Sequence, residues 1–526
     1  METSMKRLLL ISLIAMASSC SFLDVEVNNV ATADNYYRSI DELEDALTGV
    51  YATLADNALY GEAMMGRLGL SADIGYEYYK KDAGTVGYYQ AGVSDSRIAS
   101  FWRALYAGIG RANMLLAGID GVDGTADVLA RREQIRGEAL FLRSYYYYML
   151  VKRFENVPLV LTPVEDINSS EKYVGQASPK EVYQKIMSDL ETAAGLVPAT
   201  SAVDGGWQVC QTAVWGMLAR VALNMAGQPV GETSMYQKAA QYARLVMESG
   251  EHALNPVFED IFIDQCRNVF DVKEVLFEVN FWGDNTGTYQ TAGTVGRNIG
   301  IASSEESPVG YCMGLLRCNP ILWYLYDASD KRRDWTVSTF RYSADGSKAE
   351  DSESAPISRK YCAKWRREYE VSSSKSTTCT EINFPILRYS DVLLMYAEAY
   401  AWHPAGLDRD LALKCLNMVR RRGHGVDVSS PSAFDWSGDD EALRREIMDE
   451  RAREFAFEML RKDDLVRWGI FYERMQEALD NIDGSSASYQ LAAIETYSSA
   501  RKRDSLWPIP AREISVNPLL KQNPGW

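Results

Sequence analysis

The chain has 526 residues, of which 47% are hydrophobic and 24% are charged. This composition is that of a folded globular protein and excludes collagen-like, mucin-like and mainly disordered classes. The 55 Lys and Arg residues against 72 Asp and Glu residues give a formal charge of -17, so nucleic acid and anionic lipid surfaces would on average be repelled and nucleic acid is not expected as a partner.

The N-terminus has the pattern of an export signal. Lys6 and Arg7 precede an apolar run from Leu8 to Ala17, which is too short to span a bilayer, and no later run is long enough. We therefore expect residues 1–19 to be a signal peptide. The small residues before Cys20 resemble a bacterial lipobox, in which this cysteine is lipidated and becomes the first mature residue. The alternative is an ordinary signal peptide followed by an incidental cysteine.

Helical periodicity recurs along the chain. Apolar residues at spacings of three and four begin at Ile135 and stop before Pro158, which predicts a helix with one buried face. Similar stripes predict helices over 213–222, 236–249, 391–402, 411–422 and 441–468, the last holding one or two helices. We expect antiparallel hairpins that resemble tetratricopeptide-like packing, although no strict repeat can be counted.

Three segments lack a helical stripe and are rich in Gly, Ser, Thr, Asp and Tyr: 71–100, 281–311 and 340–380. We expect long loops with short strands there, and loops of this length usually carry function. Alternation and β-branched residues predict a short strand over 274–279. The last stretch, 506–526, contains four prolines and is expected to run extended over the helical body. The predicted fold is mainly α, with one large globule that carries loops and short strands on one face.

No catalytic signature is present in the sequence. It lacks G-x-S-x-G, H-E-x-x-H, a P-loop and a glycine-rich dinucleotide turn, and its adjacent acidic pairs are more typical of salt bridges than of a glycosidase. On a continuous helix, Glu458 and Lys462, and likewise Asp463 and Arg467, would pair at i,i+4. We expect Glu398 to bond a neighbouring helix or an arginine rather than to act as an acid.

Cysteine and histidine usage does not predict a metal site. Seven cysteines remain after Cys20, no C-x-x-C occurs, and the three histidines stand far from one another. We therefore expect mostly buried thiols, no metal and no cofactor. Cys312 and Cys318 are close enough in sequence to form a disulfide within one loop, which stays open as an alternative.

Aromatic side chains on the expected loops are the strongest candidates for ligand contact. A sugar ring stacks its C–H face on an aromatic plane while its hydroxyls bond polar neighbours, so this composition suits carbohydrate binding. An extended peptide could use the same surface, and single rings could instead pin the loops to the helical body. The candidate ligand-binding residues are Tyr76, Tyr78, Tyr79, Tyr88, Tyr89, Trp282, Tyr289 and Tyr311.

Several blocks of sequence stand out in chain order. They are GEALFLRSYYYY at 137–148 with VPLV at 157–160, DKRRD at 330–334, NFPILRYSDVLLMYAEA at 383–399, ERAREFAFE at 450–458 with DLVRWG at 464–469, and LWPIP at 506–510 with QNPG at 522–525. In this order, and over nearly the whole chain, they resemble the motifs of the SusD/RagB family of outer-membrane lipoproteins of Bacteroidetes.

The resemblance implies an N-terminal helical region, 20–260, packed against a loop-rich C-terminal region, 261–526, and a lipid anchor at Cys20 on the cell surface. It also implies that the protein covers a SusC-like TonB-dependent transporter, captures oligosaccharides or polysaccharides, and passes them inward without cleaving them. Ligand residues vary within this family, so none is assigned by motif. The motif residues that we expect to be structural are Arg388, Asp391, Glu454 and Arg467.

Two alternative functions stay open beside glycan capture. The same architecture could capture oligopeptides, since an acidic surface favours basic ones. A glycoside hydrolase is the third hypothesis, because paired carboxylates do occur in the sequence.

Overall fold

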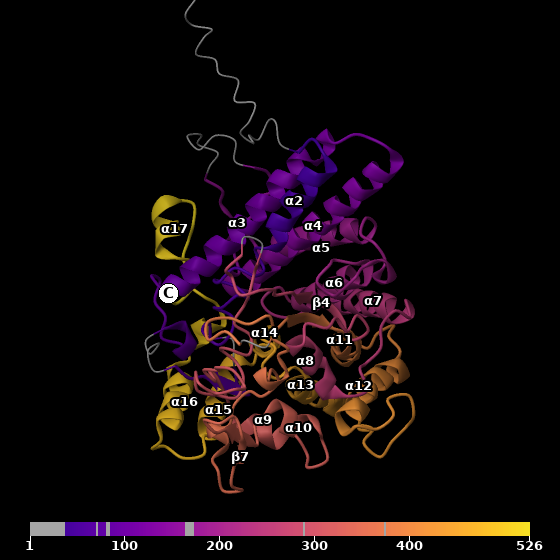
Figure 1. The fold of residues 1–526 in the computed structure, drawn as a ribbon. Helices are drawn as coiled ribbons and strands as arrows, with labels where there is room; N and C mark the ends of the chain where they lie inside the picture. Colours follow the sequence, from indigo (N-terminus) through magenta and orange to yellow (C-terminus); the bar gives the residue numbers. More distant parts are fainter. Residues whose placement is uncertain (1–36, 70–71, 80–84, 164–172, 288–289, 373–374) are drawn as a thin grey trace, which may run out of the picture.

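The computed structural model describes residues 37–69, 72–79, 85–163, 173–287, 290–372 and 375–526 (Figure 1). These residues form sixteen α-helices and eight short strands, so the fold is mainly α, as predicted. Cys20 and Tyr289 lie outside the described residues, and the predictions for them stay open.

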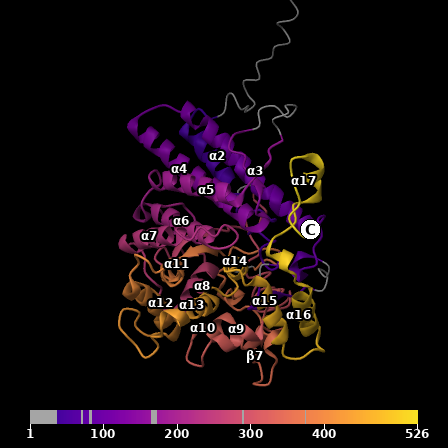
Figure 2. The same cartoon turned by 180° about the vertical axis from the view of Figure 1, so that it is seen from behind.

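The N-terminal half is a stack of helices in chain order. Helices α2 and α4 pack together, and from α3 to α7 each helix packs on the next (Figures 1 and 2). This arrangement is a series of helical hairpins, of which the sequence predicts α4, α6 and α7 but not α2, α3 or α5. The helices are α2 (Ile40–Tyr51), α3 (Ser96–Gly118), α4 (Ala126–Phe154), α5 (Pro179–Ala194), α6 (Gln211–Ala226) and α7 (Met235–Glu248).

The stack continues after a long insertion. Helix α11 (Tyr389–Trp402) packs on α7 and on α12 (Arg409–His424), although residues 249–388 separate α7 from α11 in the chain. In both views α11 and α12 lie next to α6 and α7. The remaining helices are α8 (Phe258–Cys266), α9 (Pro320–Leu325), α10 (Arg332–Thr336), α13 (Asp440–Phe455), α14 (Arg461–Arg467), α15 (Phe471–Asp480), α16 (Ser488–Ser499) and α17 (Ala511–Val516).

Side-chain caps explain where several of these helices begin. Ser178 and Glu181 form a capping box at α5, with Pro179 at the first helical position, where its missing N–H costs nothing. The carboxylate of Asp95 accepts hydrogen bonds from the second and third backbone N–H groups of α3. Helix α3 therefore begins at Ser96, and the expectation of a loop over 71–100 is wrong for its last five residues.

The eight strands form four antiparallel pairs. The pairs are β1 (Gly75–Glu77) with β5 (Leu316–Cys318), β2 (Val157–Pro158) with β3 (Gln176–Ala177), β4 (Val275–Val279) with β8 (Phe384–Arg388), and β6 (Phe340–Tyr342) with β7 (Lys348–Glu350).

The β4–β8 pair joins the two ends of the insertion and is buried along its whole length. Val275 lies opposite Arg388, and Val279 lies opposite Phe384. Helix α6 approaches this pair at Gly216, where a Cβ atom would lie 2.6 Å from Leu387 Cδ2. Only a residue without a side chain permits this close approach.

Buried ion pairs fix the β4–β8 pair against the C-terminal helices. The Arg388 guanidinium, at the end of β8, lies 2.9 Å from Glu274 and 2.8 Å from both Glu454 and Glu458. All four side chains are buried. Burial alone would raise the pKa of Glu454, but Arg422 and Arg388 outweigh it and hold this pKa well below its usual range.

The prediction of i,i+4 pairs over 458–467 is wrong, although these residues are structural as expected. Helix α13 ends at Phe455, and the chain turns before α14 begins. Glu458 therefore faces Arg388 and Lys364, and Asp463 contacts Lys152 on α4 at 2.8 Å. Arg467 binds Glu398 on α11, which confirms the structural role predicted for this glutamate.

Two further expectations have clear outcomes. All seven cysteines in the described residues are buried and free, so the predicted buried thiols are confirmed and Cys312 forms no disulfide with Cys318. The C-terminal stretch runs over the helical body largely as expected, and its Asn523 side chain donates to the carbonyl of Phe154 at 3.0 Å. Helix α17 interrupts it, which the proline count did not predict.

Replacing Arg388 by Met should lower the stability by about 3–5 kcal/mol, because three buried carboxylates would lose their shared cation. Urea unfolding followed by circular dichroism measures this change. Arg244→Ala is the control, since the Arg244–Glu248 pair on α7 is exposed and should change the midpoint little. An Arg388→Met midpoint equal to that of the wild type would contradict the structural role of the network.

Candidate functional site

The structure buries three of the candidate aromatic residues. Tyr76, Tyr88 and Tyr89 are at most 6% exposed and pack in a core cluster with residues of α15 and α16. The Tyr76 hydroxyl donates to the carbonyl of Ser358 at 2.7 Å, and the Tyr89 hydroxyl donates to that of Gly69 at 3.2 Å. The prediction that these three rings face a ligand is therefore wrong, because their loop is covered by the C-terminal helices.

Tyr78 and Tyr79 are half-buried, and a guanidinium lies over each ring. Arg317 is 4.9 Å from the centroid of the Tyr78 ring, and Arg67 is 5.1 Å from that of Tyr79. The Tyr78 hydroxyl also lies 3.0 Å from Ser488 Oγ. A guanidinium therefore covers one face of each ring, and ligand contact by the other face stays a prediction.

Trp282 is the most exposed of the described candidates, at 56%. It lies three residues beyond the end of β4, and its backbone exchanges two hydrogen bonds, of 3.0 and 2.9 Å, with Thr291. Tyr311 is half-buried, with the Arg297 guanidinium 5.6 Å from its ring centroid. The structure thus gives Trp282 an open indole plane on a fixed backbone.

Trp282 borders a polar cavity of about 400 Å³. The lining combines one aromatic plane with hydroxyl, amide and carboxylate groups, and it includes no Lys, Arg or His. The lining residues are Trp282, Gly283, Asp284, Thr286, Gln290, Glu370, Ser372, Ser376, Cys379, Thr380 and Glu381.

The two walls of this cavity continue β4 and β8. Beyond β4, the backbone N–H of Gly283 donates to Glu381 Oε1 at 2.6 Å. Gly293 and Thr380 exchange backbone hydrogen bonds of 3.0 and 2.8 Å. The walls are therefore cross-linked to each other, and the buried strand pair sets their positions.

Gln290 holds the turn that follows Trp282. Its Oε1 atom accepts backbone hydrogen bonds from Asp284, Thr286 and Gly287, at 3.1 to 3.2 Å. The side-chain hydrogen bond from Thr286 lowers the pKa of the Asp284 carboxyl. Asp284 therefore stays ionised at neutral pH as a hydrogen-bond acceptor at the cavity.

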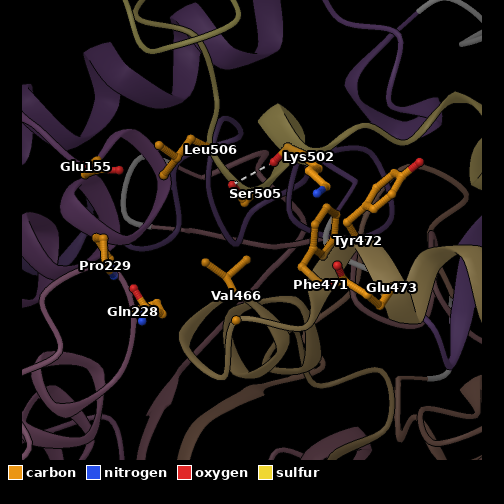
Figure 3. Close-up of a pocket in the computed structure, with 11 residues that line it drawn as sticks. Glu155, Gln228, Pro229, Val466, Phe471, Tyr472, Glu473, Lys502, Ser505 and Leu506 are labelled. Carbon is orange, nitrogen blue, oxygen red and sulfur yellow. Dashed lines mark hydrogen bonds between the residues drawn. The ribbon is translucent and has the colours of Figure 1, made fainter.

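A second cavity, of about 300 Å³, lies between the C-terminal segment and α14 and α15 (Figure 3). Figure 3 shows Val466 between Gln228 and Pro229 on one side and Phe471 on the other. Its rings offer less open surface than Trp282, because Phe471 is buried and the Lys502 ammonium lies 5.8 Å from the Tyr472 ring centroid. The sequence analysis assigns no ligand-binding role to these residues, since no aromatic-rich loop marks them.

A third hollow, of about 230 Å³, lies between the end of α2 and the end of β4, and we call it the α2–β4 groove. Glu278 on β4 lines it, is only 2% exposed, and has an Oε1 atom without a hydrogen-bond partner among the described residues. Burial, with a contribution from Asp271, raises the pKa of Glu278 to about 8. The lining residues are Thr48, Tyr51, Ala52, Leu54, Ala55, Trp207, Glu278, Val279, Asn280 and Thr291.

Two family models match this chain. A model described as "SusD family" matches residues 285–526, and one described as "Starch-binding associating with outer membrane" matches residues 21–223. The chain belongs to the SusD/RagB family. Within the described ranges of this SusD-family chain, no helix has both the length and the apolar character needed to cross a membrane.

Individual relatives extend over almost the whole chain. It is 24% identical to SusD-like protein P2 of Formosa agariphila, over 96% of this chain and 97% of the relative. A SusD homologue from Bacteroides thetaiotaomicron superposes with a TM-score of 0.85 at 28% identity, over 94% of this chain and 98% of the other. Surface glycan-binding protein A from Bacteroides fluxus has the same fold, with a TM-score of 0.72, 24% identity, and coverage of 93% and 100%.

The buried acid Glu278 should make the stability depend on pH. Between its ordinary pKa near 4.5 and the raised value of about 8, the folded chain binds more protons than the unfolded chain. The wild type therefore loses stability as the pH rises through this window, by on the order of 5 kcal/mol in full. Glu278→Gln stays neutral and should not show this loss, which urea midpoints at pH 5, 7 and 8.5 would measure.

The exposed Glu350 on β7 offers a matched control for this measurement. Glu350→Gln should reproduce the wild-type pH profile. Parallel profiles for wild type and Glu278→Gln would contradict the burial of an unpartnered acid.

Proposed function

We propose that this SusD-family protein binds a glycan in the Trp282 cavity without cleaving it. The observation that carries the proposal is the 56% exposed indole of Trp282 beside ionised and hydroxyl side chains. A pyranose ring can stack on the indole while its hydroxyls donate to the carboxylates of Asp284 and Glu381. The family description "Starch-binding associating with outer membrane" supports this proposal.

The charges of the cavity favour a neutral glycan. Asp284, Glu370 and Glu381 line it, and no Lys, Arg or His is among its described lining residues. Arg367 pairs with Glu370 at 2.8 Å, so Asp284 and Glu381 carry most of the negative charge. A sulfated or uronate-rich polysaccharide would meet like charges there, which disfavours its binding. The proposed ligand is therefore an oligosaccharide or polysaccharide without acidic groups.

The proposal also covers the cellular location of the protein and its partner protein. Lipidation of Cys20 would anchor the mature chain in the outer membrane at the cell surface, and the glycan would pass to a SusC-like TonB-dependent transporter. The signal-like N-terminus and the membership in the SusD/RagB family support these two statements. The missing hydrolase signatures support binding without cleavage.

Trp282→Ala should weaken retention by the cognate neutral glycan at least tenfold, because the stacking plane is lost. Affinity electrophoresis through gels that contain starch, laminarin or a sulfated polysaccharide measures this. Tyr324→Ala is the control, since Tyr324 on α9 is 75% exposed and does not line this cavity. Unchanged retention of Trp282→Ala would contradict the site. Retention by no glycan, together with calorimetric binding of basic peptides, would replace the proposal by oligopeptide capture.

Cys20→Ser should move the protein from the membrane fraction to the soluble fraction of an expressing bacterial cell. Acyl chains contribute roughly 0.8 kcal/mol for each buried methylene, so loss of a multiply acylated cysteine removes the anchor. Fractionation with labelled palmitate measures both attachment and lipid content. Equal membrane retention of wild type and Cys20→Ser, with no label in either, would contradict lipidation.

A further inference from the structure

The α2–β4 groove is built differently from the Trp282 cavity. Its walls are largely apolar, from the end of α2 and the turn that follows it, and Trp207 closes one side with 36% of its surface exposed. The backbone fixes this side, because the N–H of Glu278 donates to the carbonyl of Gly206 at 2.9 Å. The volume of about 230 Å³ suits one ring or one side chain rather than a long polymer.

Two polar atoms at the groove lack hydrogen-bond partners among the described residues. They are Oε1 of Glu278 and Oδ1 of Asn280, and both are shielded from solvent. A buried polar atom without a partner costs free energy, so a pair of them beside one hollow points to a ligand that supplies donors. Asn280 Oδ1 is an acceptor at any pH, and Glu278 Oε1 becomes a charged acceptor when a bound cation lowers the pKa of this carboxyl and its proton is released to solvent.

The charge of the surroundings selects the kind of donor. Among the described residues, no Lys, Arg or His lines the groove, and Asp271 adds negative potential at Glu278. A primary ammonium carries three donors and one positive charge, and it is attracted to the faces of aromatic rings such as those of Trp207 and Tyr51. A hydroxyl brings a single donor and no charge.

We infer that the α2–β4 groove binds a protonated primary amine of the ligand, with Glu278 and Asn280 as its acceptors and Trp207 as its aromatic wall. The groove adjoins the Trp282 cavity, because Thr291 lines the groove and its backbone bonds that of Trp282. The inference stands on the groove itself and does not require that the cavity bind a glycan. The amine can come from an amino sugar or from a lysine side chain, and these two sources need separate probes.

Calorimetry on the purified full chain carrying Cys20→Ser tests the inference with three probes. They are a glucosamine trisaccharide, the same trisaccharide with every amine acetylated, and trilysine. The trisaccharide with free amines should bind at least tenfold tighter than the acetylated trisaccharide, and Glu278→Gln should remove this difference in affinity. Binding of trilysine with the same dependence on Glu278 would identify a peptide as the source of the amine, whereas its absence would identify the sugar.

Controls separate the groove from the overall charge and from the cavity. Glu350→Gln makes the same substitution at an exposed position and should leave the affinity for the amine unchanged. Trp207→Ala should weaken amine binding even if Glu278→Gln folds poorly. Equal affinity for free and acetylated trisaccharides, or no binding of either amine probe at millimolar concentration, would overturn the inference. The inference would also be overturned if Trp282→Ala abolished amine binding while Glu278→Gln and Trp207→Ala left it intact. That result would place the amine in the Trp282 cavity.

Discussion

Arg388 lies among three buried carboxylates, whose charges it shares with Arg332, Arg422 and Lys364, and the position of the β4–β8 pair against the C-terminal helices depends on this contact. Each of these carboxylates would cost several kcal/mol if it were buried without a cation. One guanidinium joins Glu274, next to β4, with Glu454 on α13 and Glu458 in the turn beyond it. Because a guanidinium donates in fixed directions, the strand pair is held in both position and orientation against the helices. A hydrophobic contact alone would let the strand pair slide more freely against the helices.

The fixed strand pair sets the positions of the residues in the candidate site. The backbone that leaves β4 carries Asn280 and then Trp282, while the backbone that enters β8 carries Thr380 and Glu381. The helical stack of α2 to α7, α11 and α12 acts as the scaffold, and the insertion between α7 and α11 carries the candidate site. This division is typical of binding proteins in which loops on a rigid body form the site.

The sequence predicts α4, α6, α7 and α11 to α14 from their apolar spacing, although α4, α6 and α11 are buried on nearly every side rather than along one stripe. It does not mark α2, α3 or α5 as helices. It also predicts the strand over β4, the buried thiols and the structural role of Glu398. The aromatic residues on loops predict ligand contact less well, because a position on a loop does not show whether another element covers the side chain. Tyr76 and Tyr89 lie under α15 and α16, which are about 400 residues away in the chain. The α2–β4 groove could not be predicted for the same reason, because α2 and β4 meet only in the folded chain.

The crystal structure of the complex with a neutral hexasaccharide, from whichever of starch or laminarin retards the protein, tests the central claim most directly. The account predicts one pyranose ring stacked on the indole of Trp282, with its hydroxyls donating to Asp284 or Glu381. A hexasaccharide bound in the cavity of Figure 3, with the Trp282 plane bare, would contradict it.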